Sequence, residues 1–180
     1  GETVDRISER MKRGGRLFYI GCGTSGRLGV LDASECPPTF GVSPELVQGI
    51  IAGGRERMFT AGESAEDSYE GGKNAILESG AVCGDVVVGI SAAGNASFIM
   101  GALEYAKELG CVTIGLSSND DASIFDICDV KIYTDTGAEM VTGSTRLKAG
   151  TAQKIVLNTL TTCAMIKTGK VYENMMINLA

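Results

Sequence analysis

Residues 15–41, GRLFYIGCGTSGRLGVLDASECPPTFG, constrain the fold more than any other stretch of the chain. They open with an apolar run, residues 17–20, that has the length and composition of a buried strand. Three glycines follow, and a short helical segment, residues 27–31, runs on until Pro37 and Pro38 stop it. A strand, a glycine turn and a helix start predict an anion site, because free N–H groups and the positive end of the helix face the ligand.

The glycine spacing, G-x-G-x-x-G from residue 21, also fits the dinucleotide-binding fingerprint. That fingerprint requires an acidic residue about 20 positions later, at the end of the second strand. The second apolar run, residues 47–52, ends in Gly-Gly-Arg at residues 53–55 instead. Thr24 and Ser25 offer hydroxyl groups that suit the oxygens of a terminal phosphate. These features favour a phosphorylated small molecule over a dinucleotide, and a plain turn remains the alternative for each glycine taken singly.

Composition limits the kinds of catalysis and the partners that we expect, and it indicates the cellular compartment. The chain has 180 residues, which suits one domain, residues 1–180, with a substantial core. Histidine is absent, which excludes Ser-His-Asp and Cys-His catalysis and makes a zinc site unexpected. We expect no metal and no cofactor. A net charge of −6 argues against nucleic acid and anionic membranes as partners. The six cysteines have no Cys-x-x-Cys spacing, and reduced thiols in apolar runs suit the cytoplasm.

The remaining pattern alternates short β-branched runs with helical periods. Such alternation predicts a three-layer α/β/α sandwich with a five-stranded parallel sheet, without an internal linker or repeat. Thr60 and Glu63 have capping-box spacing and predict that the third helix starts there. The expected strands are residues 17–20, 47–52, 86–90, 112–116 and 130–133, and the expected helices are residues 3–13, 27–31, 60–77, 98–109 and a long helix from residue 143.

Two further loops carry hydroxyl groups immediately before a helix. One follows the strand at residues 86–90 and contains Ser91, Gly94 and Ser97. In an open α/β sheet the ligand lies beyond the carboxyl ends of the strands, so this loop and Gly23-Thr24-Ser25 can converge on one anion. Ser144 and Thr145 precede the last helix, where a simple N-cap pair is the favoured alternative.

Four segments together resemble the bacterial N-acetylmuramic acid 6-phosphate etherase family of the sugar isomerase (SIS) domain superfamily. The resemblance covers the chain from about residue 14 onward. The segments are GCGTSGRLG from Gly21, DASECPPT from Asp32, AEDS from Ala65 and TGSTRLKAGTAQK from Thr142.

The resemblance implies a flavodoxin-like SIS sandwich that binds a phosphorylated amino sugar and is usually a homodimer, with sites near the interface. Family members extend further at both ends, so the chain corresponds to their SIS core. The implied reaction removes D-lactate from C3 of the sugar by elimination and then adds water. The glucokinase regulatory proteins, which bind sugar phosphates without chemistry, provide the alternative function, and an isomerase is the weaker third.

The resemblance places the catalytic base at Glu66 and the acid at Glu35. A base in the first turns of a helix would be kept ionised by the helix dipole. The apolar residues after Glu35 would raise its pKa and keep a proton available. For each glutamate, an ordinary solvated side chain is the alternative. A helix from residue 26 to residue 34 would carry Glu35 about 13 Å from the phosphate loop, so either the chain folds back at the prolines or Glu35 serves the partner subunit.

The second loop departs from the family pattern. It has Ala93 where the family has serine, and residues 95–97 are Asn-Ala-Ser where the family has Arg-Thr-Pro. Two hydroxyl groups and a cation are therefore missing, and Ser97 is a candidate substitute. Lys148 lies one helical turn beyond Ser144, so we expect it either to face the same anion or to be a solvated cation.

Overall fold

A computed structural model describes residues 1–62 and 65–178. The helices are α1 Glu2–Lys12, α2 Gly23–Phe40, α3 Tyr69–Ser79, α4 Ser97–Glu108 and α5 Lys148–Lys167, with short 3-10 helices η1 Arg55–Met58 and η2 Ser123–Asp126. The strands are β1 Leu17–Gly21, β2 Val47–Ile51, β3 Val86–Ile90, β4 Val112–Ser117, β5 Val130–Tyr133, β6 Val171–Tyr172 and β7 Met175–Met176. The last two strands pair as a small antiparallel hairpin after α5.

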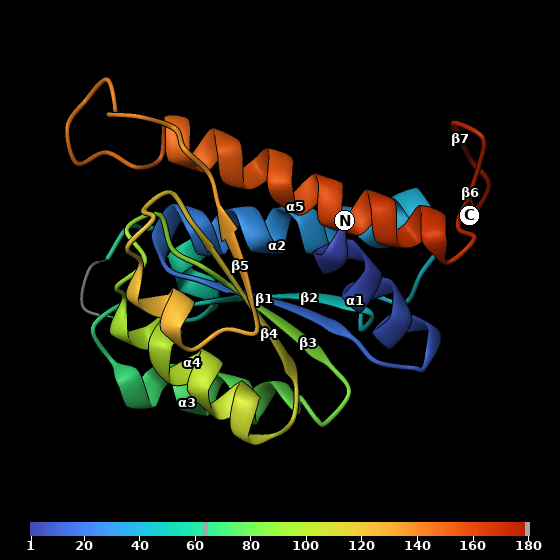
Figure 1. Cartoon of the computed structure of the whole chain (residues 1–180), viewed down its shortest axis with the longest axis horizontal. Coiled ribbons are helices and arrows are strands. Elements are labelled where there is room, and N and C mark those ends of the chain that lie inside the picture. Colours follow the sequence, from blue (N-terminus) through green and yellow to red (C-terminus); the bar gives the residue numbers. More distant parts are fainter. Residues whose placement is uncertain (63–64, 179–180) are drawn as a thin grey trace.

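Within the described ranges, strands β1 to β5 form one parallel sheet in the order β2-β1-β3-β4-β5. Helices α1, α2 and α5 cover one face of this sheet, and α3 and α4 cover the other (Figure 1). The predicted three-layer α/β/α sandwich with five parallel strands is therefore confirmed. None of the helices described by the structure is long and apolar enough to cross a membrane.

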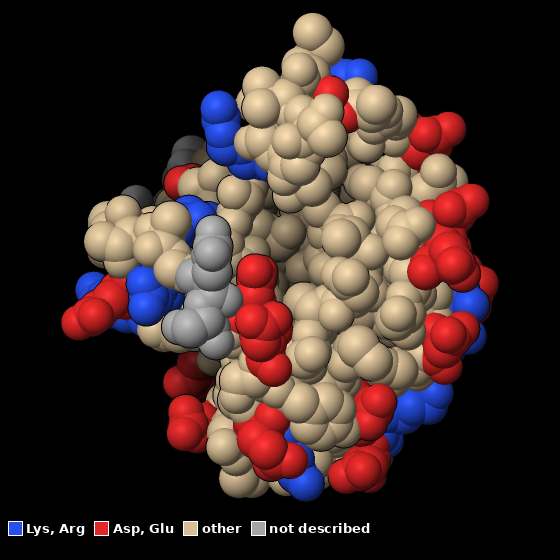
Figure 2. Space-filling view, turned by 90° about the vertical axis from the view of Figure 1, so that its left-hand side faces the viewer, with Lys and Arg blue, Asp and Glu red and all other residues tan. Residues whose placement is uncertain are grey.

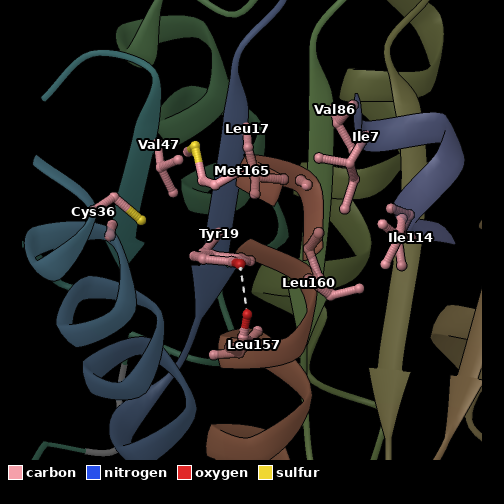
Figure 3. Close-up of a cluster of buried hydrophobic side chains, with 14 of the residues drawn as sticks. Ile7, Leu17, Tyr19, Cys36, Val47, Val86, Ile114, Leu157, Leu160 and Met165 are labelled. Atoms are coloured by element: carbon pink, nitrogen blue, oxygen red, sulfur yellow. Dashed lines mark hydrogen bonds between the residues drawn. The ribbon is translucent and has the colours of Figure 1, made fainter. Parts of the chain in front are cut away.

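Strand β1 supplies core residues to both faces of the sheet, because successive side chains of a strand point in opposite directions. Leu17 and Tyr19 pack under α1, α2 and α5, whereas Phe18 and Ile20 pack under α3 and α4. All four are fully buried. The Tyr19 hydroxyl donates to the Leu157 carbonyl at 3.4 Å (Figure 3). Burial of such side chains contributes about 1.5–3 kcal/mol each.

Helix α2 is longer than the sequence predicts. It continues through Pro37 and Pro38 and ends at Phe40, so the predicted stop at the prolines is wrong. Proline has a helical φ angle, and near the end of a helix its missing N–H removes a bond that the last turn can lose. The helix ends instead at Gly41, which adopts a left-handed φ of 62° and donates its N–H to the Pro37 carbonyl at 2.9 Å.

Helix α3 begins later than predicted. Its first residue is Tyr69, and the Ser68 hydroxyl caps it by accepting from the Gly71 N–H at 3.0 Å. The predicted start at Thr60 is therefore wrong, and its partner Glu63 lies outside the described residues. A serine cap near the first buried residue of the helix overrides the capping-box spacing further upstream. Residues 65–67 form a turn before the helix.

A buried carboxylate lies between α2 and α5. Asp32 is 6% exposed, and its Oδ1 accepts from Asn158 Nδ2 at 2.6 Å and from the Thr161 hydroxyl at 3.3 Å. Its Oδ2 has no hydrogen-bond partner among the described residues. Burial raises the pKa of Asp32 above 3.8, and the neighbouring donors oppose the rise only in part.

We predict that Asp32→Asn changes how stability depends on pH. The raised pKa means that folding favours the protonated acid, so this stabilisation is complete below the unfolded pKa and is lost as pH rises through the folded pKa. The free energy of unfolding of the parent should therefore fall relative to the variant between about pH 4 and about pH 7. Urea titrations of both proteins at the two pH values measure the difference. A constant difference would show that folding does not raise the pKa of Asp32.

Candidate functional site

A cavity of about 400 Å³ opens at the carboxyl ends of β1 and β3. Gly21, the last residue of β1, is in register with Ile90, the last residue of β3, so the loops that follow start side by side. Figure 2 shows this end of the molecule, where a hollow is flanked by acidic side chains. The lining residues are Cys22, Gly23, Thr24, Ser25, Glu66, Asp67, Ile90, Ser91, Ala92, Ala93, Asn95, Ala96 and Thr145.

The first loop brings the start of α2 directly onto the end of β1. A Cβ atom on Gly21 would lie 2.5 Å from the Gly26 nitrogen, and one on Gly26 would lie 2.5 Å from the Gly21 carbonyl oxygen. Only glycine fits at either position. The N–H of Gly26 is bonded to the Cys22 carbonyl at 3.2 Å, whereas the N–H groups of the three preceding residues belong to the first helical turn and have no partner within the helix. Because all three residues line the cavity, these groups are candidate donors for an anion.

The second loop is fixed by its own hydrogen bonds. The Ser91 hydroxyl accepts from the Gly94 N–H at 3.0 Å, and the Ser117 hydroxyl donates to the Ala92 carbonyl at 3.0 Å. Gly94 has a φ of 77° and packs against Ala122, so no side chain fits there. Gly94 therefore fixes the conformation of the loop without lining the cavity. Ser97 opens α4 and, like Gly94, is not among the lining residues.

Glu66 lies at the cavity, but not in the setting that the sequence predicts. It occupies the exposed turn before α3, two residues ahead of the cap Ser68. The prediction that Glu66 lies in the first turns of a helix, whose dipole would keep it ionised, is therefore wrong. Its carbonyl accepts from the Phe98 N–H at 3.0 Å, in the first turn of α4. The backbone of the proposed base is thereby tied to the helix that follows the second loop.

Sequence reasoning missed Asp67 and Cys22 as lining residues, although both are adjacent to residues that it named. Burial, followed by the nearby charges of Glu66 and Asp67, raises the pKa of the Cys22 thiol to about 12. A raised pKa favours the neutral thiol over the thiolate, which is the nucleophilic form of cysteine.

The third predicted loop contributes only Thr145 to the cavity lining. Helix α5 starts at Lys148, so Ser144 and Thr145 precede it without capping it. The Glu139 carboxylate occupies the helix start instead, accepting from the N–H groups of Lys148 at 2.9 Å and Ala149 at 3.0 Å. Lys148 Nζ donates to the Ala138 carbonyl at 2.8 Å, so this side chain is engaged outside the cavity lining.

Glu35 is separate from the cavity within one chain. It is exposed on α2, twelve positions after Gly23, and a helix rises about 18 Å over that length. The chain does not fold back at the prolines, since α2 is continuous through them. The structure thus brings together Glu66, Gly23, Thr24, Ser25, Ser91 and Thr145, and it leaves Glu35, Gly94, Ser97, Ser144 and Lys148 outside the lining.

The charge at the cavity is unusual for an anion site. Of the lining residues that the structure describes, two are carboxylates and none is Lys or Arg. The nearby cation Arg27 donates to the carbonyls of Met58 at 3.0 Å and Thr60 at 3.4 Å, which anchors the segment after β2. Attraction for an anion therefore comes from N–H groups, hydroxyls and the helix dipole.

The fold is that of an α/β protein, and its candidate site is a cavity beyond the carboxyl ends of the strands. Residues 1–107 match the family model of the glucokinase regulatory protein N-terminal SIS domain, and the chain belongs to this SIS-domain family.

Relatives extend the comparison over nearly the whole chain. The chain is 56% identical over 178 residues to an N-acetylmuramic acid 6-phosphate etherase of Caldanaerobacter subterraneus subsp. tengcongensis, covering 99% of the chain and 58% of that protein. It is 53% identical to the protein of the same name from Clostridioides difficile, covering 99% of the chain and 59% of that protein. The resemblance predicted from the motifs is confirmed, and the chain spans somewhat more than half the length of these relatives.

A solved structure supports the fold alone. A phosphoheptose isomerase from Francisella tularensis superposes with a TM-score of 0.62 at 14% identity, covering 93% of this chain and 86% of that chain.

We predict that Glu139→Gln destabilises the start of α5, because the variant keeps only one of the two acceptor oxygens and loses the charge that favours a helix N-terminus. The two N–H donors lower the pKa of Glu139, so its stabilisation is present above 4.5 and is lost as pH falls through the lowered pKa. The urea midpoint of the variant should lie below that of the parent at neutral pH and approach it in acid. Glu9→Gln, on an exposed part of α1, is the control. Equal midpoints for parent and Glu139→Gln at neutral pH would show that this contact adds no stability.

Proposed function

We propose that the chain is the single SIS domain of an N-acetylmuramic acid 6-phosphate etherase, a cytoplasmic carbon-oxygen lyase of cell-wall recycling. The reaction releases D-lactate and N-acetylglucosamine 6-phosphate. The observation that carries this proposal is identity above 50% over nearly the whole chain to proteins of that name. The anion loops and a carboxylate at one cavity agree with a phosphorylated sugar as substrate.

In this proposal the first loop binds the phosphate and Glu66 acts as the base. In the ring-opened sugar C1 is an aldehyde, so the C2 hydrogen becomes acidic and a carboxylate can remove it. The electron pair then expels the lactyl oxygen from C3, and water adds to the resulting double bond. Thr24, Ser25 and Ser91 lie on the same cavity as Glu66, so a phosphate held there places the rest of the sugar beside the base.

Protonation of the leaving oxygen requires a second acid, and we propose Glu35 for that task. Within one chain Glu35 lies about 18 Å along α2 from the first loop, which is too far to reach C3 of the same sugar. We therefore propose a homodimer in which Glu35 of one chain completes the cavity of the other.

A phosphosugar-binding regulator without catalysis is the second candidate. Two observations favour it: the matching family model carries the name of a regulatory protein, and no Lys or Arg is found among the lining residues that the structure describes. The regulator would bind the sugar phosphate and release no lactate. An assay of D-lactate release by the full-length protein distinguishes the two functions.

We predict different losses from the two glutamates. Glu66→Gln should abolish lactate release and the exchange of the C2 hydrogen with D₂O, while phosphosugar binding survives. Glu35→Gln should slow release but leave some exchange, because protonation of the leaving group is a separate step. General acid–base groups contribute about 10²–10⁴-fold, so both losses should be readily measured. Equal and small effects of the two substitutions would contradict the assignment, and Glu45→Gln at an exposed position is the control.

We also predict that the two impaired variants complement each other. Mixed dimers of Glu35→Gln and Glu66→Gln chains contain one cavity with both native glutamates and one with neither. Such dimers should recover about half the parental activity per dimer. Failure to recover activity in dimers shown to be mixed would mean that each site is built from one chain.

A further inference from the structure

Behind the first loop, two buried polar side chains meet. Ser25 lines the cavity from the first turn of α2, and Gln153 on α5 lies directly behind it. Ser25 Oγ and Gln153 Oε1 are 3.0 Å apart, with Ser25 8% exposed and Gln153 1% exposed. Gln153 Nε2 is also buried, and it has no hydrogen-bond partner among the described residues.

This arrangement sets the direction in which Ser25 can donate. A serine hydroxyl has one hydrogen. If Ser25 gives it to Gln153 Oε1, only oxygen lone pairs face the cavity, and they repel the oxygens of an anion. An anion site needs the opposite polarity, with the Ser25 hydrogen directed into the cavity.

Rotation of the Gln153 amide by half a turn supplies that polarity. The two ends of the amide have nearly the same shape, and their assignment follows from the hydrogen-bond network. With Nε2 facing Ser25, the amide donates to Oγ and the hydroxyl hydrogen is free for the anion. The group left without a partner is then a carbonyl oxygen, which folded proteins leave unpaired more readily than a buried N–H.

The packing keeps this contact away from water. Gly150, one turn before Gln153, lies beside the first turn of α2, where a Cβ atom on it would be in ordinary van der Waals contact with Thr24 Cγ2, at 3.4 Å. Helix α5 thus packs against the anion loop, and Gln153 is the α5 residue that bonds to Ser25. Because Gln153 is only 1% exposed, its side of the contact is shielded from bulk solvent.

We propose that Gln153 is a positioning residue for the anion site: its amide donates through Nε2 to Ser25 Oγ and so makes Ser25 a donor to the bound phosphate. The role rests on the proposed phosphosugar site. Gln153 lies outside the cavity lining, so it would act only through Ser25.

A double-mutant cycle with the full-length protein and glucosamine 6-phosphate tests this role by calorimetry. Gln153→Met, which keeps the length of the side chain and removes both donor and acceptor, should weaken binding about 10–150-fold, as expected for one hydrogen bond to a charged group. In the Ser25→Ala background the same change should have no effect. The control is Thr161→Val, about two turns further along α5, where a buried hydroxyl bonds to Asp32 away from the cavity; it should bind like the parent.

A second variant tests the role of Gln153 through the pH dependence of binding, which a change in packing alone would not alter. In Gln153→Glu, an ionised carboxylate can only accept from Ser25, whereas the protonated acid can donate to it. Binding by this variant, relative to the parent at the same pH, should therefore improve as pH falls from about 7 to about 5. This test remains available if Gln153→Met does not fold.

The outcomes separate the inference from the proposed function. If Ser25→Ala binds like the parent, both the phosphate site and the role of Gln153 are wrong. If Ser25→Ala weakens binding but Gln153→Met does not, or if Gln153→Met weakens it equally without Ser25, only the role of Gln153 is wrong. A relative affinity of Gln153→Glu that does not change with pH would also overturn that role.

Discussion

The close approach of two backbone segments, at Gly21 and Gly26, is the contact on which the site depends. Any side chain at either position would overlap the other segment, so the end of β1 and the first turn of α2 can meet only through glycine. The contact places the first turn of α2, with its free N–H groups, against the end of β1. Since β1 pairs with β3 in register, the loop that follows β3 lies beside them, and a single cavity forms. The geometry of the sheet thus assembles the site from segments about 70 residues apart in the chain.

The charge of the cavity sets how an anion can be held. With two carboxylates and no Lys or Arg among the described lining residues, simple charge attraction is unfavourable. Backbone N–H groups, hydroxyl groups and the α2 dipole must outweigh that repulsion. The direction of each hydroxyl therefore matters more here than in a site lined by arginine. In the proposed dimer, Glu35 of the other chain would add an acid to this cavity.

Much of the fold and part of the site follow from local sequence patterns. The first strand, the glycine loop and the strand at residues 86–90 are predicted because their apolar runs and glycines admit few other structures. The errors arise where tertiary contacts, and not the local sequence, determine where a helix begins or ends. Pro37 and Pro38 are tolerated because they lie in the last turns of α2, and the start of α5 is occupied by Glu139, nine residues upstream in the chain. The buried Gln153 was not predicted, because nothing in a helical pattern shows which neighbour a polar side chain meets.

The most direct test of this anion site is a crystal structure of the full-length protein with glucosamine 6-phosphate. The phosphate should lie over the first turn of α2, with its oxygens about 3 Å from the N–H groups of Thr24 and Ser25 and from the hydroxyls of Ser25 and Ser91. A phosphate bound instead in the separate groove at the start of α5, lined by Thr136, Arg146 and Lys148, would contradict it.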